Sequence, residues 1–140
     1  GDVYKRQVRR YATYALPLNV SLAVEPINRY ETNLTSTIDQ AMKVVDEVGL
    51  DNVGVLADTF HMNIEEVSLA ESLRSAGDRL LQVQFTDSNG LAAGRGHIVF
   101  PELGAVLREF GYAGYLSTET LPLPDSRTAA QQALDFFRSL

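Results

Sequence analysis

The sequence repeats one pattern four times: a short apolar run, a polar loop, and a segment with apolar residues at helical spacing. The apolar runs cover residues 20–24, 53–57, 80–85 and 114–117, and the helical segments follow at about 38–48, 63–76, 101–110 and 126–137. Strands joined in series by helices form a parallel sheet with right-handed crossovers. We therefore expect an α/β fold of four βα units, preceded by the tail of a helix over residues 8–16 that Pro17 ends.

Two architectures fit such a series of βα units. One is an open doubly wound sheet, and the other is part of a (β/α)8 barrel, which takes about 250 residues when complete. The chain has 140 residues, roughly half of that length. No GxGxxG motif follows any apolar run, and the glycines over residues 90–96 lie far from a nucleotide-binding fingerprint.

Composition excludes several classes of function. A formal net charge of −6 makes the chain a poor candidate for binding nucleic acid. The absence of cysteine excludes disulfides, thiolate zinc sites and cysteine nucleophiles. Neither a signal peptide nor an apolar run of about 18 residues is visible, so we expect a cytoplasmic protein without a membrane partner.

The first residues differ from the rest of the chain. There is no initiator Met, and residues 1–10 are rich in basic side chains with little apolar period. We expect Gly1–Gln7 to be non-native or disordered, and residues 8–140 to form a partial barrel domain. A processed or frayed helix start is the alternative.

Each strand ends close to a polar side chain that can bind a metal: Glu25, Asp58, Gln84 and Glu119. Parallel strands bring their carboxyl ends to one edge, where barrel enzymes keep their active sites. Carboxylates packed together repel one another, and a divalent cation relieves that repulsion. Oxygen donors favour Mg, Mn or a similar ion. The alternative is that strand ends are polar only because loops begin there.

Three strings of residues resemble a known family. They are EPINRYE at 25–31, DTFHMNIEE at 58–66 and GRGH at 94–97, followed by a strand that ends near Glu119. Over residues 20–140 they resemble sugar isomerases and epimerases with a xylose-isomerase-like TIM barrel, including ketose 3-epimerases and hydroxypyruvate isomerase. The resemblance implies the C-terminal half of the barrel, strands five to eight. It also implies a divalent metal, commonly Mn with Mg or Co as alternatives, held by Glu25, Asp58, Gln84 and Glu119.

The sequence departs from the epimerases of this family at two positions. The third metal ligand of the 3-epimerases is His, whereas Gln84 resembles the Gln of hydroxypyruvate isomerases. The epimerases also carry a substrate-binding Arg six residues later, where this chain has Gly90. Arg95 of the same loop is a candidate replacement, and an ordinary surface arginine is the alternative.

The resemblance implies proton abstraction next to a carbonyl through an enediolate, with Glu25 and Glu119 as the catalytic acid and base. It assigns Glu31 and His61 to substrate binding, against the alternatives of a solvated carboxylate and a capping histidine. Arg29 is interpreted as part of an ion pair that fixes its loop. Glu65 and Glu66 are interpreted as serving the start of a helix.

We therefore predict a metal-dependent carbohydrate epimerase or isomerase that acts on a small sugar. The alternatives are a hydroxypyruvate isomerase-like enzyme and an inactive barrel fragment that needs a partner half. The two edge strands of a half-barrel invite pairing, so a homo-oligomer is also considered. A DNA-repair endonuclease on the same barrel is disfavoured, since it needs a His-rich multi-zinc site and the chain has two His.

Overall fold

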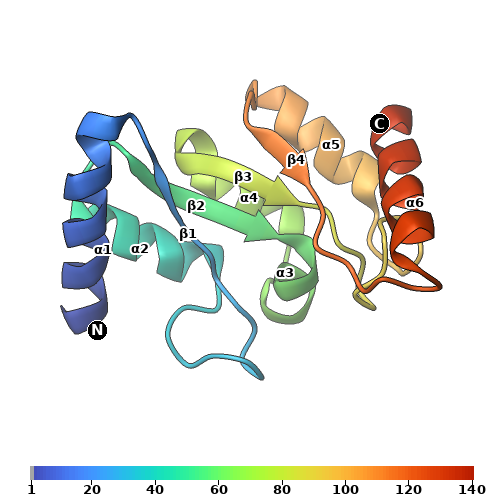
Figure 1. The fold of residues 1–140 in the computed structure, drawn as a ribbon, viewed down its shortest axis with the longest axis horizontal. Coiled ribbons are helices and arrows are strands. Elements are labelled where there is room, and N and C mark those ends of the chain that lie inside the picture. Colours follow the sequence, from blue (N-terminus) through green and yellow to red (C-terminus); the bar gives the residue numbers. More distant parts are fainter. Residues whose placement is uncertain (1) are drawn as a thin grey trace.

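The fold is a four-stranded parallel sheet with helices packed along it (Figure 1). The computed structural model describes residues 2–140. The strands are β1 (Leu22–Val24), β2 (Val53–Asp58), β3 (Leu80–Gln84) and β4 (Tyr115–Ser117), hydrogen-bonded in that order. The helices are α1 (Asp2–Ala15), α2 (Ile38–Val48), α3 (Thr59–Glu65), α4 (Leu69–Ala76), α5 (Phe100–Glu109) and α6 (Ser126–Ser139), with short 3-10 turns η1 (Leu16–Leu18) and η2 (Gly77–Arg79).

The two faces of the sheet have different surroundings. On one face Val55, Val83 and Phe85 are fully buried in the core cluster, together with the apolar sides of the helices. Helices α1, α2, α4 and α5 contact one another in chain order, and α6 joins α5 through Phe136 against Phe100. A doubly wound sheet carries helices on both faces. The single layer of helices is instead the arrangement of a barrel wall.

Most of the expected elements are confirmed, and one is wrong. We expected a single helix over residues 63–76, but the structure has two, α3 and α4, separated by residues 66–68. Asp58 starts α3 early by accepting from the N–H of Phe60, and the Ser68 side chain caps α4 at Glu71. Val67, which fits the helical spacing, is fully exposed in the break.

Short polar side chains cap α2 and α6. The cap of α2 is Thr37, whose hydroxyl accepts from Gln40 N–H at 3.3 Å. The neighbouring Ser36 donates its N–H to the Gln40 side chain. Asp125 caps α6 by accepting the N–H of Thr128.

Gly54 fits a close approach between β2 and the chain that enters β3. A Cβ on Gly54 would lie 2.3 Å from the carbonyl oxygen of Arg79 and 2.6 Å from Cγ of Leu81. The register of β2 on β3 shifts directly after it, between Val55 and Leu56. A residue without a side chain lets the strands meet there.

The beginning of the chain is helical where the structure describes it. Helix α1 includes Asp2–Gln7, and Tyr4 packs against the core. Gly1 lies outside the described residues. That Gly1–Gln7 is a non-native or disordered start stays a prediction. Within residues 2–140, no helix combines the length and the apolar character that crossing a bilayer requires.

Candidate metal centre

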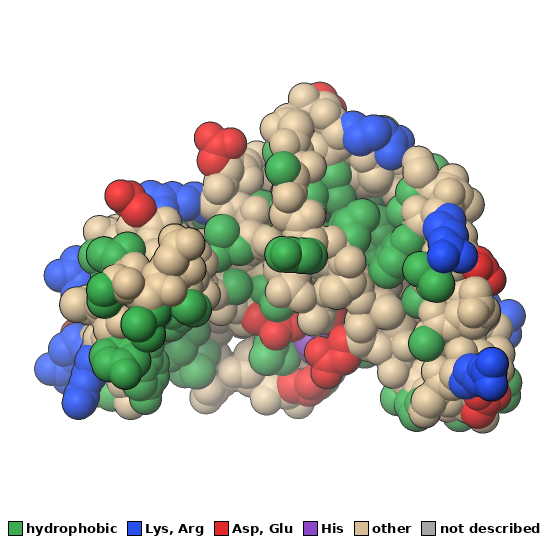
Figure 2. All heavy atoms as spheres, turned by 45° about the horizontal axis from the view of Figure 1, so that its top comes forward, with side chains coloured by type: hydrophobic (Ala, Val, Ile, Leu, Met, Phe, Trp, Pro, Cys, Tyr) green, Lys and Arg blue, Asp and Glu red, His purple; other side chains and the backbone are tan. Residues whose placement is uncertain are grey.

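A cavity of about 490 Å³ opens at the carboxyl ends of the strands. Figure 2 shows acidic side chains gathered around a histidine in the middle of one face of the molecule. The cavity is lined by residues at or just after the ends of all four strands. Its lining residues include Glu25, Glu31, Asp58, His61 and Glu119. Five of the predicted site residues are therefore brought together.

Asp58 is the most buried carboxylate of this group, with 4% of its surface exposed. It ends β2, and its Oδ1 accepts the N–H of Phe60 at 2.8 Å as the cap of α3. Burial is the main cause that raises the pKa of Asp58 to about 7. The negative charges of Glu25, Glu119 and Glu31 contribute to this rise, and the Phe60 N–H acts against it. The site therefore disfavours an anion at Asp58 unless a positive charge joins it.

Glu25 lies directly after β1, at the edge of the sheet. Its side chain is 28% exposed, and burial followed by repulsion from Glu119 and Glu31 raises its pKa. One donor atom each from Glu25, Asp58 and His61 lies within 4.8 Å of the others. This is the only such acidic or histidine cluster within residues 2–140. The spacing suits a divalent cation.

Gln84 supplies an oxygen that lacks a partner. It ends β3 in register with Asp58, and its Oε1 is buried without a hydrogen bond. Within residues 2–140 only one other buried side-chain oxygen, that of Asn52, is in the same condition. An unsatisfied buried oxygen costs free energy, and a cation ligated by it would offset that cost. Gln84 is nevertheless not among the residues that line the cavity, so its place in the ligand set stays a prediction. Carboxylate and amide oxygens are the donors that a hard divalent metal such as Mn or Mg prefers.

Glu119 is held by a pair of threonines that the sequence did not reveal. Thr86 donates its hydroxyl to the Glu119 carbonyl at 2.9 Å and accepts the Glu119 N–H at 3.3 Å. Thr59, fully buried, donates to the Thr86 carbonyl at 2.7 Å and accepts the Thr86 N–H at 2.9 Å. The β2, β3 and β4 ends are thereby tied together. Threonine is common in loops, so the sequence alone does not indicate that these two threonines are hydrogen-bonded.

His61 lies over the cavity in the first turn of α3. Its side chain is 12% exposed, with Nε2 4.0 Å from Oε1 of Glu25. Burial lowers the pKa of His61, against the opposing effect of Glu31 and Glu119. Buried Asn28 reaches both Nδ1 of His61 and the Glu31 carboxylate. Asn28 was missed because asparagine in a loop predicts only a turn.

The remaining predicted residues have other surroundings. Arg29 pairs with Glu65 at 2.8 Å, which confirms the ion pair that fixes the loop. Glu66 accepts the N–H of Ile38 at the start of α2, and so caps a different helix from the one we expected. Arg95 is exposed and is not among the residues that line the cavity. Its role in substrate binding stays a prediction.

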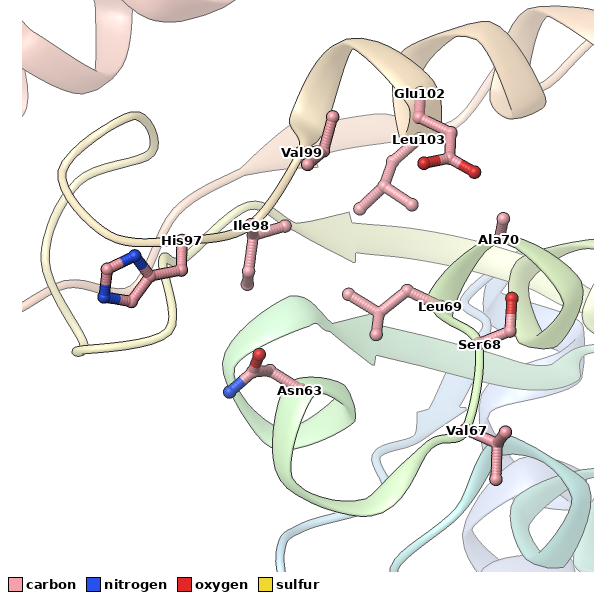
Figure 3. Close-up of a pocket in the computed structure, with 10 residues that line it drawn as sticks. All are labelled: Asn63, Val67, Ser68, Leu69, Ala70, His97, Ile98, Val99, Glu102 and Leu103. Carbon is pink, nitrogen blue, oxygen red and sulfur yellow. The ribbon is translucent and has the colours of Figure 1, made fainter.

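A second cavity of about 290 Å³ lies between the α3–α4 turn and the start of α5. In Figure 3 Leu69, Ile98 and Leu103 project into it, while the His97 ring points away toward its own loop. Its polar side chains do not converge on a point. The acidic cavity is therefore the stronger candidate for chemistry.

The fold and the site define a class of protein: a wall of a parallel α/β barrel with a metal-capable acidic cluster at the carboxyl ends of its strands. The model of the xylose isomerase-like TIM barrel family matches residues 2–140. The chain belongs to this family.

Three of the proteins that the chain is similar to are 3-epimerases. A D-psicose 3-epimerase from Enterocloster bolteae is 39% identical over 109 residues, 78% of this chain and 36% of the relative. An L-ribulose 3-epimerase from Methylomonas sp. is 36% identical over 113 residues, 81% of this chain and 40% of the relative. The crystal structure of D-psicose 3-epimerase with D-tagatose from Clostridium cellulolyticum H10 superposes with a TM-score of 0.89 at 31% identity.

The chain aligns with only part of these relatives. The match to the crystal structure covers 96% of this chain and 54% of the other. The four parallel strands thus correspond to about half of a TIM-barrel epimerase.

Proposed function

We propose that this chain carries the metal-binding half, strands five to eight, of a ketose 3-epimerase. The substrate would be a small ketose, and the reaction a proton transfer at the carbon next to its carbonyl. The observation that carries the proposal is the convergence of Glu25, Asp58 and Glu119 on one cavity, from three strands of one sheet. The ketose 3-epimerases among its relatives supply the reaction class.

The residues that would hold the metal are Glu25, Asp58, Gln84 and Glu119. Asp58 has one oxygen fixed by the α3 cap, so its carboxylate is oriented before an ion arrives. Gln84 offers its unpartnered oxygen. When bound, a divalent ion would polarise the substrate carbonyl and stabilise negative charge on the deprotonated sugar.

Glu25 and Glu119 would move the proton. They follow β1 and β4, the two outer strands of the sheet, and so reach the cavity from opposite sides. One removes the proton from the sugar carbon, and the other returns a proton to the opposite face, which inverts the centre. The raised pKa of Glu25 brings it closer to the acidity of the carbon that it must deprotonate. His61 and Glu31, at the mouth, would bind substrate oxygens.

Calorimetric titration of the full chain with MnCl2 tests the metal site directly. We expect binding of one ion, and a loss of affinity of about tenfold or more in Glu25→Gln and in Glu119→Gln. Glu102→Gln, on α5 beside the second cavity, is the matched control and should bind Mn as the parent does. Absence of binding, or equal affinity in all variants, would refute the site.

Turnover is a separate question, because the chain spans about half the length of the solved relative. In a full barrel the other strands supply the opposite wall of the pocket. We expect weak or no epimerisation of D-psicose or D-tagatose by the chain alone. Robust turnover by a monomer, with its mass checked by light scattering, would contradict this expectation and the need for a partner half.

A hydroxypyruvate isomerase-like activity is the second candidate, and Gln84 favours it. The position resembles the glutamine of those enzymes and departs from the histidine of the 3-epimerases. Conversion of hydroxypyruvate under conditions that leave ketoses unchanged would select this candidate. Gln84→His should weaken that activity without abolishing metal binding.

A further inference from the structure

We propose that Asn28 is a positioning residue that holds His61 as the tautomer with its proton on Nε2, and so keeps this nitrogen from becoming a metal ligand. The inference rests on the proposed function for its consequence, but its geometry stands in the metal-free chain. His61 belongs to the one metal-capable cluster found within residues 2–140, so its state decides which residues complete the metal shell.

The orientation of the Asn28 side chain follows from two neighbours with fixed roles. The N–H of Tyr30 can only donate, and it lies 3.0 Å from the amide oxygen, Oδ1. The carboxylate of Glu31 accepts, and its Oε1 lies 2.7 Å from the amide nitrogen, Nδ2. Turning the amide over would place oxygen against oxygen and N–H against N–H. Asn28, with 1% of its surface exposed, is therefore fixed.

The fixed amide nitrogen faces the histidine. Nδ2 of Asn28 lies 2.8 Å from Nδ1 of His61, and the backbone N–H of Asn28 points at the same ring nitrogen at 3.4 Å. Both groups are donors, so Nδ1 accepts and carries no proton. In a neutral imidazole the proton then sits on Nε2. The backbone contact supports this assignment independently of the side-chain amide.

The consequence lies on the other side of the ring. Nε2 faces Oε1 of Glu25 across 4.0 Å. A nitrogen that bears a proton donates a hydrogen bond and has no lone pair for a cation. His61 therefore presents a donor to an oxygen in the cavity, and the ligands are left to the carboxylates and Gln84. A ligating histidine ordinarily carries its proton on the other nitrogen, where an acceptor fixes it, whereas Asn28 presents donors.

The test is the ¹⁵N spectrum of the histidines in the full, metal-free chain, recorded at a pH at which the rings are neutral. We expect His61 to show a protonated Nε2 and an unprotonated Nδ1, and to keep this pattern when MgCl2 is added as a diamagnetic probe. His97, the other of the two histidines, is exposed and serves as an internal reference. A protonated Nδ1 in the parent chain would overturn the proposal.

Asn28→Asp supplies the matched perturbation. The new carboxylate accepts where the amide donated, so the proton should move to Nδ1, shifting the tautomer ratio by at least about tenfold. Asn63→Asp adds the same charge two residues from His61, on a side chain that lines the other cavity, and should leave the ratio unchanged. An equal shift in both variants, or none in the folded Asn28→Asp variant, would refute the positioning role. If Asn28→Asp does not fold, the parent spectrum decides alone. Because this readout needs neither metal nor turnover, failure of the proposed function leaves it intact.

Discussion

Adjacent residues of one strand region illustrate how differently the two faces of the sheet are used. Phe85 points into the helix-covered face, is fully buried, and packs on Phe100 at 4.9 Å and Phe137 at 6.4 Å between ring centroids. Gln84, one residue earlier, belongs to the opposite face and has a buried oxygen without a partner. The apolar face contributes stability, while the open face keeps one unsatisfied polar group, that of Gln84. Such groups are retained where a ligand would satisfy them.

The electrostatics of the two faces differ in the same way. The core cluster contains no charged side chain among the residues that form it. The open face brings carboxylates together at one edge, and the pKa values of Glu25 and Asp58 rise. Shifted pKa values of this kind are typical of catalytic and binding sites. The comparison can be tested by perturbing one face at a time.

Phe85→Ala should give the largest loss of stability. Truncating a fully buried aromatic removes its apolar contacts and leaves a cavity, at a cost of about 3–5 kcal/mol. Tyr115→Ala, an aromatic truncation at an 82% exposed position of β4, should cost less than about 1 kcal/mol. Urea unfolding followed by circular dichroism measures both. Similar losses would show that the open face is as well packed as the covered one.

Asp58 should contribute a pH dependence to unfolding. Its pKa is raised from 3.8 to about 7 in the folded chain, so between those values the folded state binds more protons than the unfolded state. The unfolding free energy of the metal-free chain should therefore fall as pH rises from about 4 to 7, by at most about 4 kcal/mol. Asp58→Asn, which can still accept from Phe60, should flatten this dependence. A stability that rises with pH across this window would contradict the assignment.

Gly54→Ala should have an intermediate effect. The added Cβ meets the Arg79 carbonyl at 2.3 Å, and a backbone atom cannot move aside without shifting β3. We expect a loss of about 1–3 kcal/mol, measured by urea unfolding. Gly104→Ala, in helix α5 where the nearest atoms are at 3.6 Å, is the control and should be neutral or stabilising by up to about 1 kcal/mol. Equal losses of stability in the two variants would contradict the idea that the close approach of β2 and β3 requires glycine at position 54.

The sequence was sufficient for the order of the elements and for the side chains at the strand ends. Apolar runs and helical periods are local signals, so the four strands and most of the helices could be predicted. The break between α3 and α4 could not, because it depends on Asp58 capping one helix while Glu66 reaches across to α2.

The candidate site shows the same limit. The cavity groups Glu25, Asp58 and Glu119 as the parallel topology predicts. The roles of Thr59, Thr86 and Asn28 depend on contacts across 27 to 33 residues of chain. Such contacts leave no periodic pattern in the sequence. The supports of the site therefore emerge only from the fold.

Gln84→Met should have the smallest effect on stability and the most specific effect on binding. Methionine keeps the length of the side chain but removes the unpartnered oxygen. The free energy of unfolding should therefore rise, by less than about 1 kcal/mol. Mn affinity should fall about tenfold, because a hard oxygen donor is lost.

Gln82→Met is the matched control on the same strand and face. It loses a hydrogen bond to Ser117 at 2.8 Å, and should therefore cost about 1 kcal/mol while leaving Mn affinity unchanged. Gln82 is therefore expected to affect the free energy of unfolding, and Gln84 the affinity for Mn. Equal effects on Mn affinity would mean that the open face acts as a general polar surface rather than as a defined ligand set.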